Sequence, residues 1–304
     1  MKTIFKPRRP LGRTGFLATQ LGAGDLADRK VPKAECVATL RRALDAGLNV
    51  VDTAPSYEEG YSEEIVGEAL RNQREGLFVI SKVDNLRDPV APQIAASLAR
   101  LGLEHTDAFV FHGVSTLEDW QYIASPGGGM DQLHAEVSAG RTRFRGISSH
   151  HPDVLSAALD DGRCDVLLFP VGPFVDMRYI TDILPRAKRA GVGTVCFKTF
   201  GAGKLLGDTV GYNQPLAMRP RGKISSGDQE TNPVLPRLTV EECLHYTLTH
   251  DPDVALLGLS FPREQDAAFA AAQTFRPLTP DAQREIRAKA EVAIQGKGQV
   301  WWNP

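Results

Sequence analysis

The sequence predicts a closed barrel of eight parallel strands, each followed by a helix: the (β/α)8 TIM barrel of the α/β class. Eight short apolar runs alternate along the chain with segments of helical spacing. The runs are continuous rather than alternating, as expected for strands covered on both faces. The 304 residues suit one such barrel, which often reaches about 250 residues or more. Eight units in series favour a closed barrel over an open sheet.

The predicted elements follow one another in strict order. Strands are expected at residues 18–24, 48–53, 77–82, 107–113, 145–149, 164–172, 192–198 and 253–260. The segments after them have helical spacing, and the fourth connection is longer than the others and contains the run "SPGGGMD" at 125–131. Several helices end in glycine, in "DAG", "SAG", "DDG" and "RAG", which is typical of a left-handed C-terminal cap.

Three segments lie outside this repeat, within what we expect to be one domain spanning 1–304. Residues 1–17, with the turn "GRTG", predict a hairpin that closes the bottom of the barrel. Residues 207–237 are rich in Gly, Pro and polar residues, and such long loops are usually lids, cofactor clamps or disordered. Residues 279–304 predict a last helix and a tail. There Trp301 and Trp302 either pack on the barrel or line the substrate mouth.

Composition excludes several classes of protein. The chain is 42% hydrophobic and 24% charged with a net charge of -2, so it has no basic excess for nucleic acid or a membrane surface. No apolar stretch approaches about 18 residues, and the N-terminus lacks the apolar core of a secretory signal. The four cysteines are far apart and form no C-x-x-C motif. We therefore expect free thiols and a cytoplasmic location.

Metal-ligand spacing is also missing. His150 and His151 are adjacent, so on an extended chain they point apart. No third ligand stands at a suitable spacing. The "GGG" at 127–129 lacks the context of a phosphate-binding motif, which favours a loop. We predict no metal site.

Four polar residues follow three consecutive predicted strands. Asp52 and Tyr57 follow the second strand, Lys82 the third and His112 the fourth. Active sites of such barrels form where strands end, so these side chains are expected to converge. Tyr57 would act as the general acid, because a neighbouring ammonium of Lys82 lowers the pKa of a phenol. Asp52 offers Lys82 a counter-charge, and His112 can donate a hydrogen bond to a substrate oxygen.

Each residue alone has a simpler explanation. A single aspartate after a strand is usually a helix N-cap, a single lysine there is usually a solvated strand end, and a single histidine is usually structural. The four together, on successive strands, favour catalysis over these explanations.

Long segments of the chain resemble the aldo-keto reductase family. They are "GLNVVDTAPSYEEGYSEEIVGEAL", "FVISK", "DAFVFHG" and the opening "PLGRTGFLATQLGAGDL", and the resemblance extends from about residue 8 to residue 275. It implies a (β/α)8 barrel that binds a nicotinamide cofactor across its mouth. It also implies a catalytic set of Asp52, Tyr57, Lys82 and His112, in which tyrosine protonates a carbonyl that receives hydride.

The same resemblance implies a set of cofactor-binding residues at the strand ends. Ser148 fits the family pattern, whereas Ser149 stands where an asparagine is usual, and the sixth strand lacks the usual glutamine. Phe197 is placed to stack on nicotinamide, and Arg263 to meet the adenosine 2′-phosphate, although Glu264 stands near the place of a second cation. The whole implied set is Gly24, Asp25, Ser148, Ser149, Phe197, Lys198, Gly258, Ser260 and Arg263. It favours NADP(H) over NAD(H).

We therefore expect an NAD(P)H-dependent oxidoreductase that reduces a small aldehyde or ketone, or oxidises the matching alcohol. Two alternatives stay open: an NAD-preferring sugar or alcohol dehydrogenase, and a cofactor-binding barrel that serves as a redox sensor with little catalysis. The sequence carries no signal for the physiological substrate or the oligomeric state.

Overall fold

A computed structural model describes residues 3–207, 235–258, 260–300 and 302–303 of the chain. The predicted long loop at 207–237 falls almost wholly outside these residues, so its interpretation as a lid stays a prediction.

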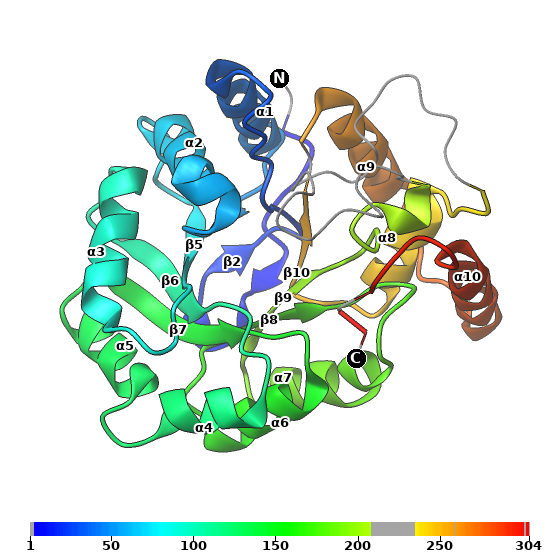
Figure 1. Ribbon diagram of the computed structural model, residues 1–304. Coiled ribbons are helices and arrows are strands. Elements are labelled where there is room, and N and C mark those ends of the chain that lie inside the picture. Colours follow the sequence, from blue (N-terminus) through cyan, green and yellow to red (C-terminus); the bar gives the residue numbers. More distant parts are fainter. Residues whose placement is uncertain (1–2, 208–234, 259, 301, 304) are drawn as a thin grey trace.

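Eight parallel strands close into a barrel in the order β10-β3-β4-β5-β6-β7-β8-β9, which confirms the predicted fold (Figure 1). Every predicted strand is present. The strands are β3 (Leu21–Ala23), β4 (Val50–Asp52), β5 (Phe78–Val83), β6 (Thr106–Phe111), β7 (Thr142–Ser148), β8 (Val166–Pro170), β9 (Gly193–Phe197) and β10 (Val254–Leu257). Strand β7 begins three residues before the predicted 145–149, because Thr142 and Phe144 pair with Thr106 and Ala108 of β6.

Helices surround the strands in a ring (Figure 1). Two of them, α4 and α5, occupy the long fourth connection, and α10 packs against α8 after the barrel is complete. The helices are α1 (Lys33–Asp45), α2 (Tyr61–Leu70), α3 (Val90–Leu101), α4 (Leu117–Ala124), α5 (Gly129–Ser138), α6 (Pro152–Asp161), α7 (Leu184–Arg189), α8 (Val240–Thr249), α9 (Pro262–Thr274) and α10 (Pro280–Ala293). The glycines predicted as caps, Gly47, Gly140, Gly162 and Gly191, all have positive φ.

Apolar side chains fill the inside of the barrel, so it is a packed core below the carboxyl ends of the strands. They include Phe78 and Ile80 of β5, Val110 of β6, and Leu168 of β8, all fully buried. Because this core fixes the strands, residues at the carboxyl ends of β4, β5 and β6 are held at defined positions.

The N-terminal hairpin closes the other end, as the sequence predicts. Its strands are β1 (Arg9–Pro10) and β2 (Leu17–Ala18), and Leu11 between them joins the apolar core of the barrel. Gly12 has φ +49, and a Cβ there would lie 2.2 Å from the backbone nitrogen of Gly193. Only glycine allows so close an approach to the start of β9.

Within the described residues, the structure contains no helix that is both long enough and apolar enough to cross a membrane.

A histidine at the C-terminal end of α8 predicts acid sensitivity. The His250 ring lies edge-on to Tyr246, with ring centroids 4.8 Å apart. Its Nε2 is buried and has no hydrogen-bond partner within residues 3–207, 235–258, 260–300 and 302–303. Burial and the nearby Arg287 lower the pKa of His250 to about 4. Between pH 6.5 and 4 the unfolded chain therefore binds more protons than the folded one, and stability falls as pH falls.

We expect His250→Phe to reduce this acid-induced loss of unfolding free energy by about 1–3 kcal/mol, because the ring packing stays and the titrating group is removed. Urea unfolding at pH 7 and pH 4.5 measures the effect. His134→Phe, at an exposed position on α5, is the control. An unchanged acid sensitivity in His250→Phe would contradict the assignment.

Candidate active site

A buried ion pair joins the ends of β4 and β5. The Lys82 ammonium donates to both carboxylate oxygens of Asp52 and to the carbonyl oxygen of Thr53, each at 2.8 Å. The two charged side chains are only 2% and 6% exposed. Burial raises the pKa of Asp52, and the Lys82 ammonium opposes that rise. Burial also disfavours the ammonium of Lys82, but Asp52 and Tyr57 raise its pKa, so the lysine stays charged.

Tyr57 lies against this pair and against His112. Lys82 Nζ is 4.6 Å from the centre of the tyrosine ring, and the His112 ring meets that ring edge-on at 5.5 Å. Burial raises the pKa of Tyr57 to about 12, with Lys82 opposing the rise and Asp52 adding to it. The expected net lowering of this pKa is wrong here. Burial outweighs the effect of the Lys82 ammonium, which Asp52 also opposes, and the phenol keeps its proton at neutral pH.

The turn that carries Tyr57 has an unusual backbone. Glu58 and Glu59 have φ of 48° and 54°, and Gly60 has φ 87°. Such conformations are costly for residues with a Cβ. Arg29, from the loop after β3, donates to the carbonyl oxygen of Glu58 from Nε at 3.0 Å and from a terminal nitrogen at 2.7 Å. These bonds brace the turn where the tyrosine leaves the barrel.

His112 follows β6, and its backbone nitrogen donates to the carbonyl oxygen of Val83 at 3.0 Å. Its Nδ1 contacts a carboxylate oxygen of Asp84, and Ser56 Oγ lies 3.4 Å from the same nitrogen. Burial lowers the pKa of His112, and Lys82 lowers it further, although Asp84 opposes both. The ring is therefore neutral at pH 7.

The sequence interpretation overlooked Asp84. Its position two residues after Lys82, at the end of β5, was the available signal. A carboxylate there also fits an ordinary turn residue, so its contact with His112 became visible only once the loop was folded.

The hydroxyls of Ser148 and Ser149, expected to bind cofactor, have protein partners. Ser148 Oγ accepts from the backbone nitrogen of Gly113 at 2.8 Å. Ser149 Oγ donates to the carbonyl oxygen of Val114 at 2.7 Å and accepts from the His151 nitrogen at 3.0 Å. The pair thus fastens the end of β7 to the loop that carries His112.

The rings of Phe197 and His150 form an aromatic surface at the end of β9. The partly exposed ring of Phe197 lies 5.2 Å from the His150 ring, and Lys198 Nζ lies 5.7 Å from Phe197. Burial, then Lys198, lowers the pKa of His150 well below its usual value. Two residues beyond Phe197, the buried hydroxyl of Thr199 has no hydrogen-bond partner among the residues that the structure describes. The exposed part of the Phe197 face could stack on a flat ring such as nicotinamide.

The remaining expected cofactor residues lie around the junction of β10, β3 and α9. The Gly24 nitrogen donates to the carbonyl oxygen of Leu257 at 2.9 Å, and Asp25 accepts from the nitrogen of Ala27 at 3.0 Å. Gly258 and Ser260 follow β10, and Arg263 lies in the first turn of α9, 5.1 Å from the Phe261 ring.

The Glu264 side chain places a carboxylate at the start of α9. Its carboxylate accepts from the backbone nitrogens of Ser260 at 3.0 Å and Phe261 at 3.2 Å. Phe261 is the N-cap of α9, so its N–H is one of the groups that the helix start would otherwise offer to an anion, and the Ser260 N–H lies just before it. The phosphate site expected there therefore contains a negative charge of its own.

Trp302 packs on the barrel, and that it also lines the substrate mouth stays a prediction. It is fully buried, its Nε1 donates to the carbonyl oxygen of Phe174 at 2.9 Å, and Lys198 Nζ lies 5.5 Å from its ring. Trp301 lies outside the described residues.

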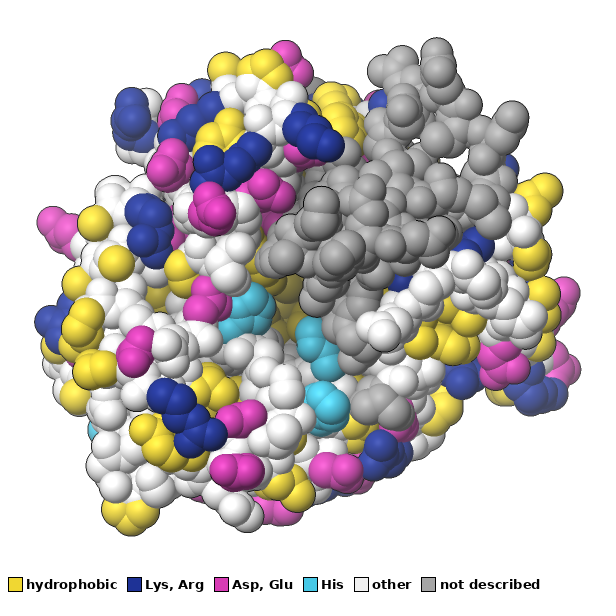
Figure 2. All heavy atoms as spheres, viewed as in Figure 1, with side chains coloured by type: hydrophobic (Ala, Val, Ile, Leu, Met, Phe, Trp, Pro, Cys, Tyr) yellow, Lys and Arg dark blue, Asp and Glu magenta, His cyan; other side chains and the backbone are white. Residues whose placement is uncertain are grey.

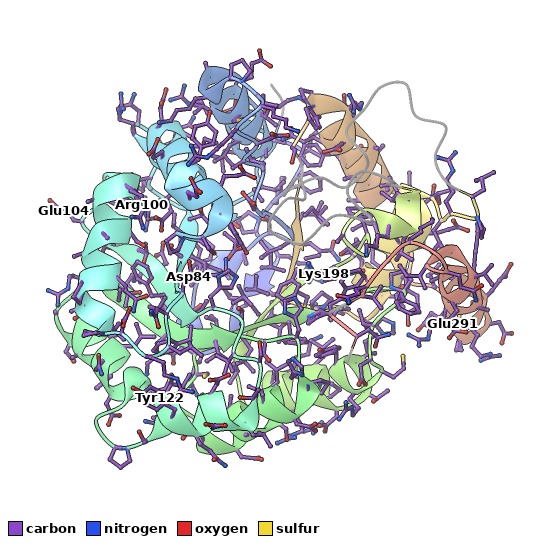
Figure 3. All side chains as sticks on the ribbon, viewed as in Figure 1. Asp84, Arg100, Glu104, Tyr122, Lys198 and Glu291 are labelled. Atoms are coloured by element: carbon purple, nitrogen blue, oxygen red, sulfur yellow. The ribbon has the colours of Figure 1, made fainter. Side chains whose placement is uncertain are left out.

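These residues surround the open end of the barrel. Figure 2 shows a hollow at the centre of this face with histidine side chains on its rim. Figure 3 places Asp84 and Lys198 on either side of that centre, from the ends of β5 and β9.

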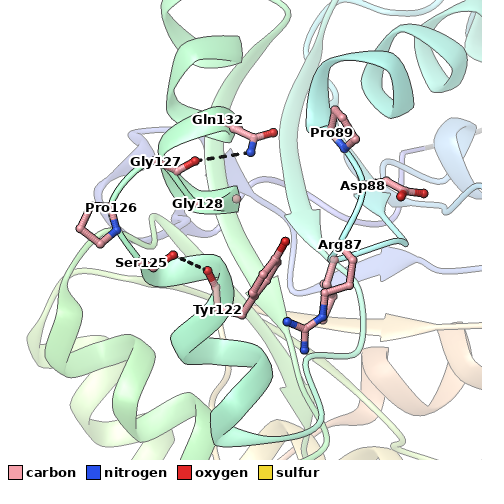
Figure 4. A pocket seen from close by; sticks show the side chains of 11 residues that line it. Arg87, Asp88, Pro89, Tyr122, Ser125, Pro126, Gly127, Gly128 and Gln132 are labelled. Atoms are coloured by element: carbon pink, nitrogen blue, oxygen red, sulfur yellow. Dashed lines mark hydrogen bonds between the residues drawn. The ribbon is translucent and has the colours of Figure 1, made fainter.

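A separate pocket of about 280 Å³ lies between the start of α3 and the turn from α4 to α5 (Figure 4). Arg87 stacks on Tyr122 there at 3.9 Å and pairs with Asp119 at 2.8 Å. Gly127 and Gly128 of the predicted "GGG" loop form its wall. None of Asp52, Tyr57, Lys82 and His112 lines it.

Comparison with known proteins identifies relatives. The model described as "Aldo/keto reductase family" matches residues 19–288. The chain is similar to L-galactose dehydrogenase of Arabidopsis thaliana, with 31% identity over 65% of this chain and 66% of that protein. It is also similar to the NADH-specific methylglyoxal reductase of Escherichia coli, with 26% identity over 65% of this chain and 68% of that protein. The matches thus span about two thirds of these relatives.

Solved structures share the fold. An aldo-keto reductase from Bacillus halodurans, AKR11C1 in its holo form, superposes with a TM-score of 0.71 and 23% identity over 95% of this chain and 97% of that one. An aldo-keto reductase from Klebsiella pneumoniae in complex with NADPH superposes with a TM-score of 0.66 and 21% identity. That superposition covers 95% of this chain and 97% of the other.

The ion pair makes a prediction about stability. Lys82→Met would leave Asp52 buried without its counter-charge, and we expect a loss of about 3–5 kcal/mol of unfolding free energy. Lys82→Met with Asp52→Asn removes both charges and should lose less. Lys33→Met, which breaks the exposed Lys33–Glu64 pair at 2.9 Å, should cost at most about 1 kcal/mol. Urea unfolding of the three variants is the measurement, and equal losses for Lys82→Met and Lys33→Met would contradict the account.

Proposed function

From the premise that the chain belongs to the aldo/keto reductase family, we propose that it is a nicotinamide-dependent oxidoreductase that reduces an aldehyde or ketone to an alcohol, or runs the reverse reaction. One observation carries the proposal. A protonated tyrosine, a charged lysine with its counter-ion and a neutral histidine meet at the open end of the barrel. Barrel enzymes place their reacting groups at this end.

Tyr57 is the proposed proton donor. Its pKa of about 12 keeps the phenol protonated, so an O–H is available for a carbonyl oxygen in the hollow. As the proton leaves, Lys82 Nζ, 4.6 Å from the ring, stabilises the negative charge on the phenolate. Tyr57 then recovers a proton from solvent. Asp52 keeps Lys82 in place and charged.

When bound, a reduced nicotinamide cofactor supplies hydride to the carbonyl carbon. The chain's own contribution is to hold that ring. The partly exposed face of Phe197 and the unsatisfied hydroxyl of Thr199 are the groups proposed for it. Ser148 and Ser149 contribute indirectly, by fixing the loop of His112.

We propose NADP(H) as the cofactor, because Arg263 lies in the first turn of α9, where a guanidinium can meet a 2′-phosphate. The NADPH-bound Klebsiella enzyme agrees with this choice. One observation favours NAD(H) as the second candidate: the Glu264 carboxylate accepts the N–H groups at that helix start. The relative from Escherichia coli is named as NADH-specific, which agrees with NAD(H) as the cofactor.

A tyrosine variant tests the proposed chemistry. Tyr57→Phe removes one oxygen and should leave folding and cofactor affinity nearly unchanged, while carbonyl reduction should fall by at least ~10²-fold, the lower end for a positioned acid. The measurement is single-turnover oxidation of bound cofactor, followed by its absorbance. Tyr61→Phe, on the first turn of α2, is the matched control. Hydride transfer at the parent rate in Tyr57→Phe would make this tyrosine structural. A parent without carbonyl reduction would favour the redox-sensor alternative.

Two variants test the cofactor assignment. Arg263→Ala should weaken NADPH binding by roughly 1–3 kcal/mol, the scale of a hydrogen bond to a charged group, and barely affect NADH. Glu264→Gln should strengthen NADPH binding, because it removes a negative charge from the place proposed for the phosphate. Fluorescence titration with both cofactors gives the affinities. Equal effects on NADPH and NADH in both variants would remove the α9 start from cofactor recognition.

A further inference from the structure

An ion pair with a fully buried carboxylate lies next to the turn that carries Tyr57. Glu63, in the first turn of α2, has a side chain that is 0% exposed. Its Oε2 accepts from Nε of Arg100 on α3 at 2.5 Å, and its Oε1 accepts from the hydroxyl of Ser81 on β5 at 2.6 Å. Burying a carboxylate is costly unless its oxygens find donors, and here both do. A single side chain therefore ties together α2, α3 and β5.

The bond from Ser81 connects Glu63 to the strand that carries Lys82. Ser81 directly precedes Lys82, and neighbouring side chains of a strand point to opposite faces, so Ser81 faces α2 and Lys82 faces the inside of the barrel. At the start of α2, the hydroxyl of Ser62 accepts from Oγ1 of Thr53 at 2.9 Å. The carbonyl oxygen of the same threonine accepts from the Lys82 ammonium. The start of α2 is thus bonded to β5 and to the residue that follows β4.

The side chain of Arg100 connects Glu63 to the tyrosine turn. It packs against Gly60, the last residue of the turn that begins at Tyr57, and a Cβ at Gly60 would lie 2.7 Å from Cδ of Arg100. Gly60 has φ 87°, a conformation that also favours glycine. Arg29 bonds to the first part of the same turn. The turn is therefore held by two arginines, and Glu63 sets the position of one of them.

We propose that Glu63 is a positioning residue for the proton donor Tyr57. Through its two hydrogen bonds it fixes the distance between the tyrosine turn and the Lys82 ammonium, which lies 4.6 Å from the centre of the ring. The proposal rests on the proposed function, because this distance matters to the reaction only if Tyr57 donates the proton. With a side chain that is wholly buried, Glu63 touches no substrate and acts through Arg100 and Ser81.

The distance decides how well the ammonium can support the phenolate. The attraction between two opposite charges falls as they separate, so a tyrosine that moves away from Lys82 loses part of this support. The phenol also leaves the point at which its proton would meet the carbonyl oxygen, and a displacement of about 1 Å can slow such a step by up to ~10²-fold. Loss of the Glu63 carboxylate should therefore slow hydride transfer and leave cofactor affinity unchanged, since the proposed nicotinamide face is at Phe197 on β9.

Two substitutions of Glu63 separate the loss of its bonds from the loss of its volume. Glu63→Leu removes both acceptors, and single-turnover oxidation of bound cofactor, counted per site that binds cofactor, should slow by roughly tenfold or more. Glu63→Gln can keep both bonds, because its amide oxygen accepts from Arg100 and its amide nitrogen donates to the hydroxyl of Ser81. It should stay close to the parent rate. A Glu63→Leu enzyme that is less stable but keeps the parent rate would make Glu63 an ordinary structural residue and overturn the proposal.

A milder pair of variants decides the question if Glu63→Leu does not fold. Ser81→Ala removes one of the two bonds to Glu63 and should slow hydride transfer. Ser97→Ala removes the other hydroxyl that Arg100 contacts, at 3.3 Å, and should leave the rate unchanged, because both of these residues belong to α3. Equal effects of the two substitutions would overturn the proposal.

Crystal structures of the variants measure the position of Tyr57 without turnover. In Ser81→Ala and Glu63→Leu, the separation of Lys82 Nζ from the centre of the Tyr57 ring should differ from the parent value of 4.6 Å by on the order of 1 Å. An unchanged separation in both variants would overturn the proposal. Hydride transfer at the parent rate in Tyr57→Phe would instead remove the proposed function on which the proposal rests, and the measured separations do not depend on that result.

Discussion

The ion pair between Lys82 and Asp52 is the constraint on which the site depends. Two opposite charges, almost completely withdrawn from water, are stable only when geometry and further hydrogen bonds compensate their lost hydration. Here the ammonium contacts both carboxylate oxygens of Asp52 and the carbonyl oxygen of Thr53. The parallel pairing of β4 with β5 places the strand ends that carry Asp52 and Lys82 side by side, so the barrel itself determines this geometry. Tyr57 and His112 lie beside the pair, and burial, together with the nearby charges, sets their protonation.

A strained turn completes the arrangement. Two consecutive glutamates with positive φ cost on the order of 1–3 kcal/mol each, and the surrounding structure has to outweigh that cost. The bonds from Arg29 to the carbonyl oxygen of Glu58 are part of that compensation. Strain of this kind at the residues directly after Tyr57 agrees with a chain that aims the tyrosine at a defined point. A relaxed turn would serve if the ring were only a packing element.

Much of this could be predicted from the sequence, for identifiable reasons. Continuous apolar runs revealed the strands, because strands buried on both faces need apolar side chains at every position. Polar residues after consecutive runs then indicated the site, because strand order fixes their proximity. The direction of the shift in the pKa of Tyr57 could not be predicted, since burial and Asp52 raise this pKa while Lys82 lowers it. The contacts of Asp84 with His112 and of Glu264 with the start of α9 depend on loop conformation, which no periodic pattern encodes.

The central claim is that a protonated Tyr57, supported by the buried ion pair, supplies the proton in the step in which hydride is transferred. A solvent deuterium isotope effect on single-turnover hydride transfer tests it most directly, because the phenol hydrogen exchanges with solvent and is replaced by deuterium in deuterium oxide. The account predicts a slower step in deuterium oxide for the parent and no such difference for Tyr57→Phe. Equal rates in both solvents for the parent, measured where hydride transfer limits the turnover, would contradict it.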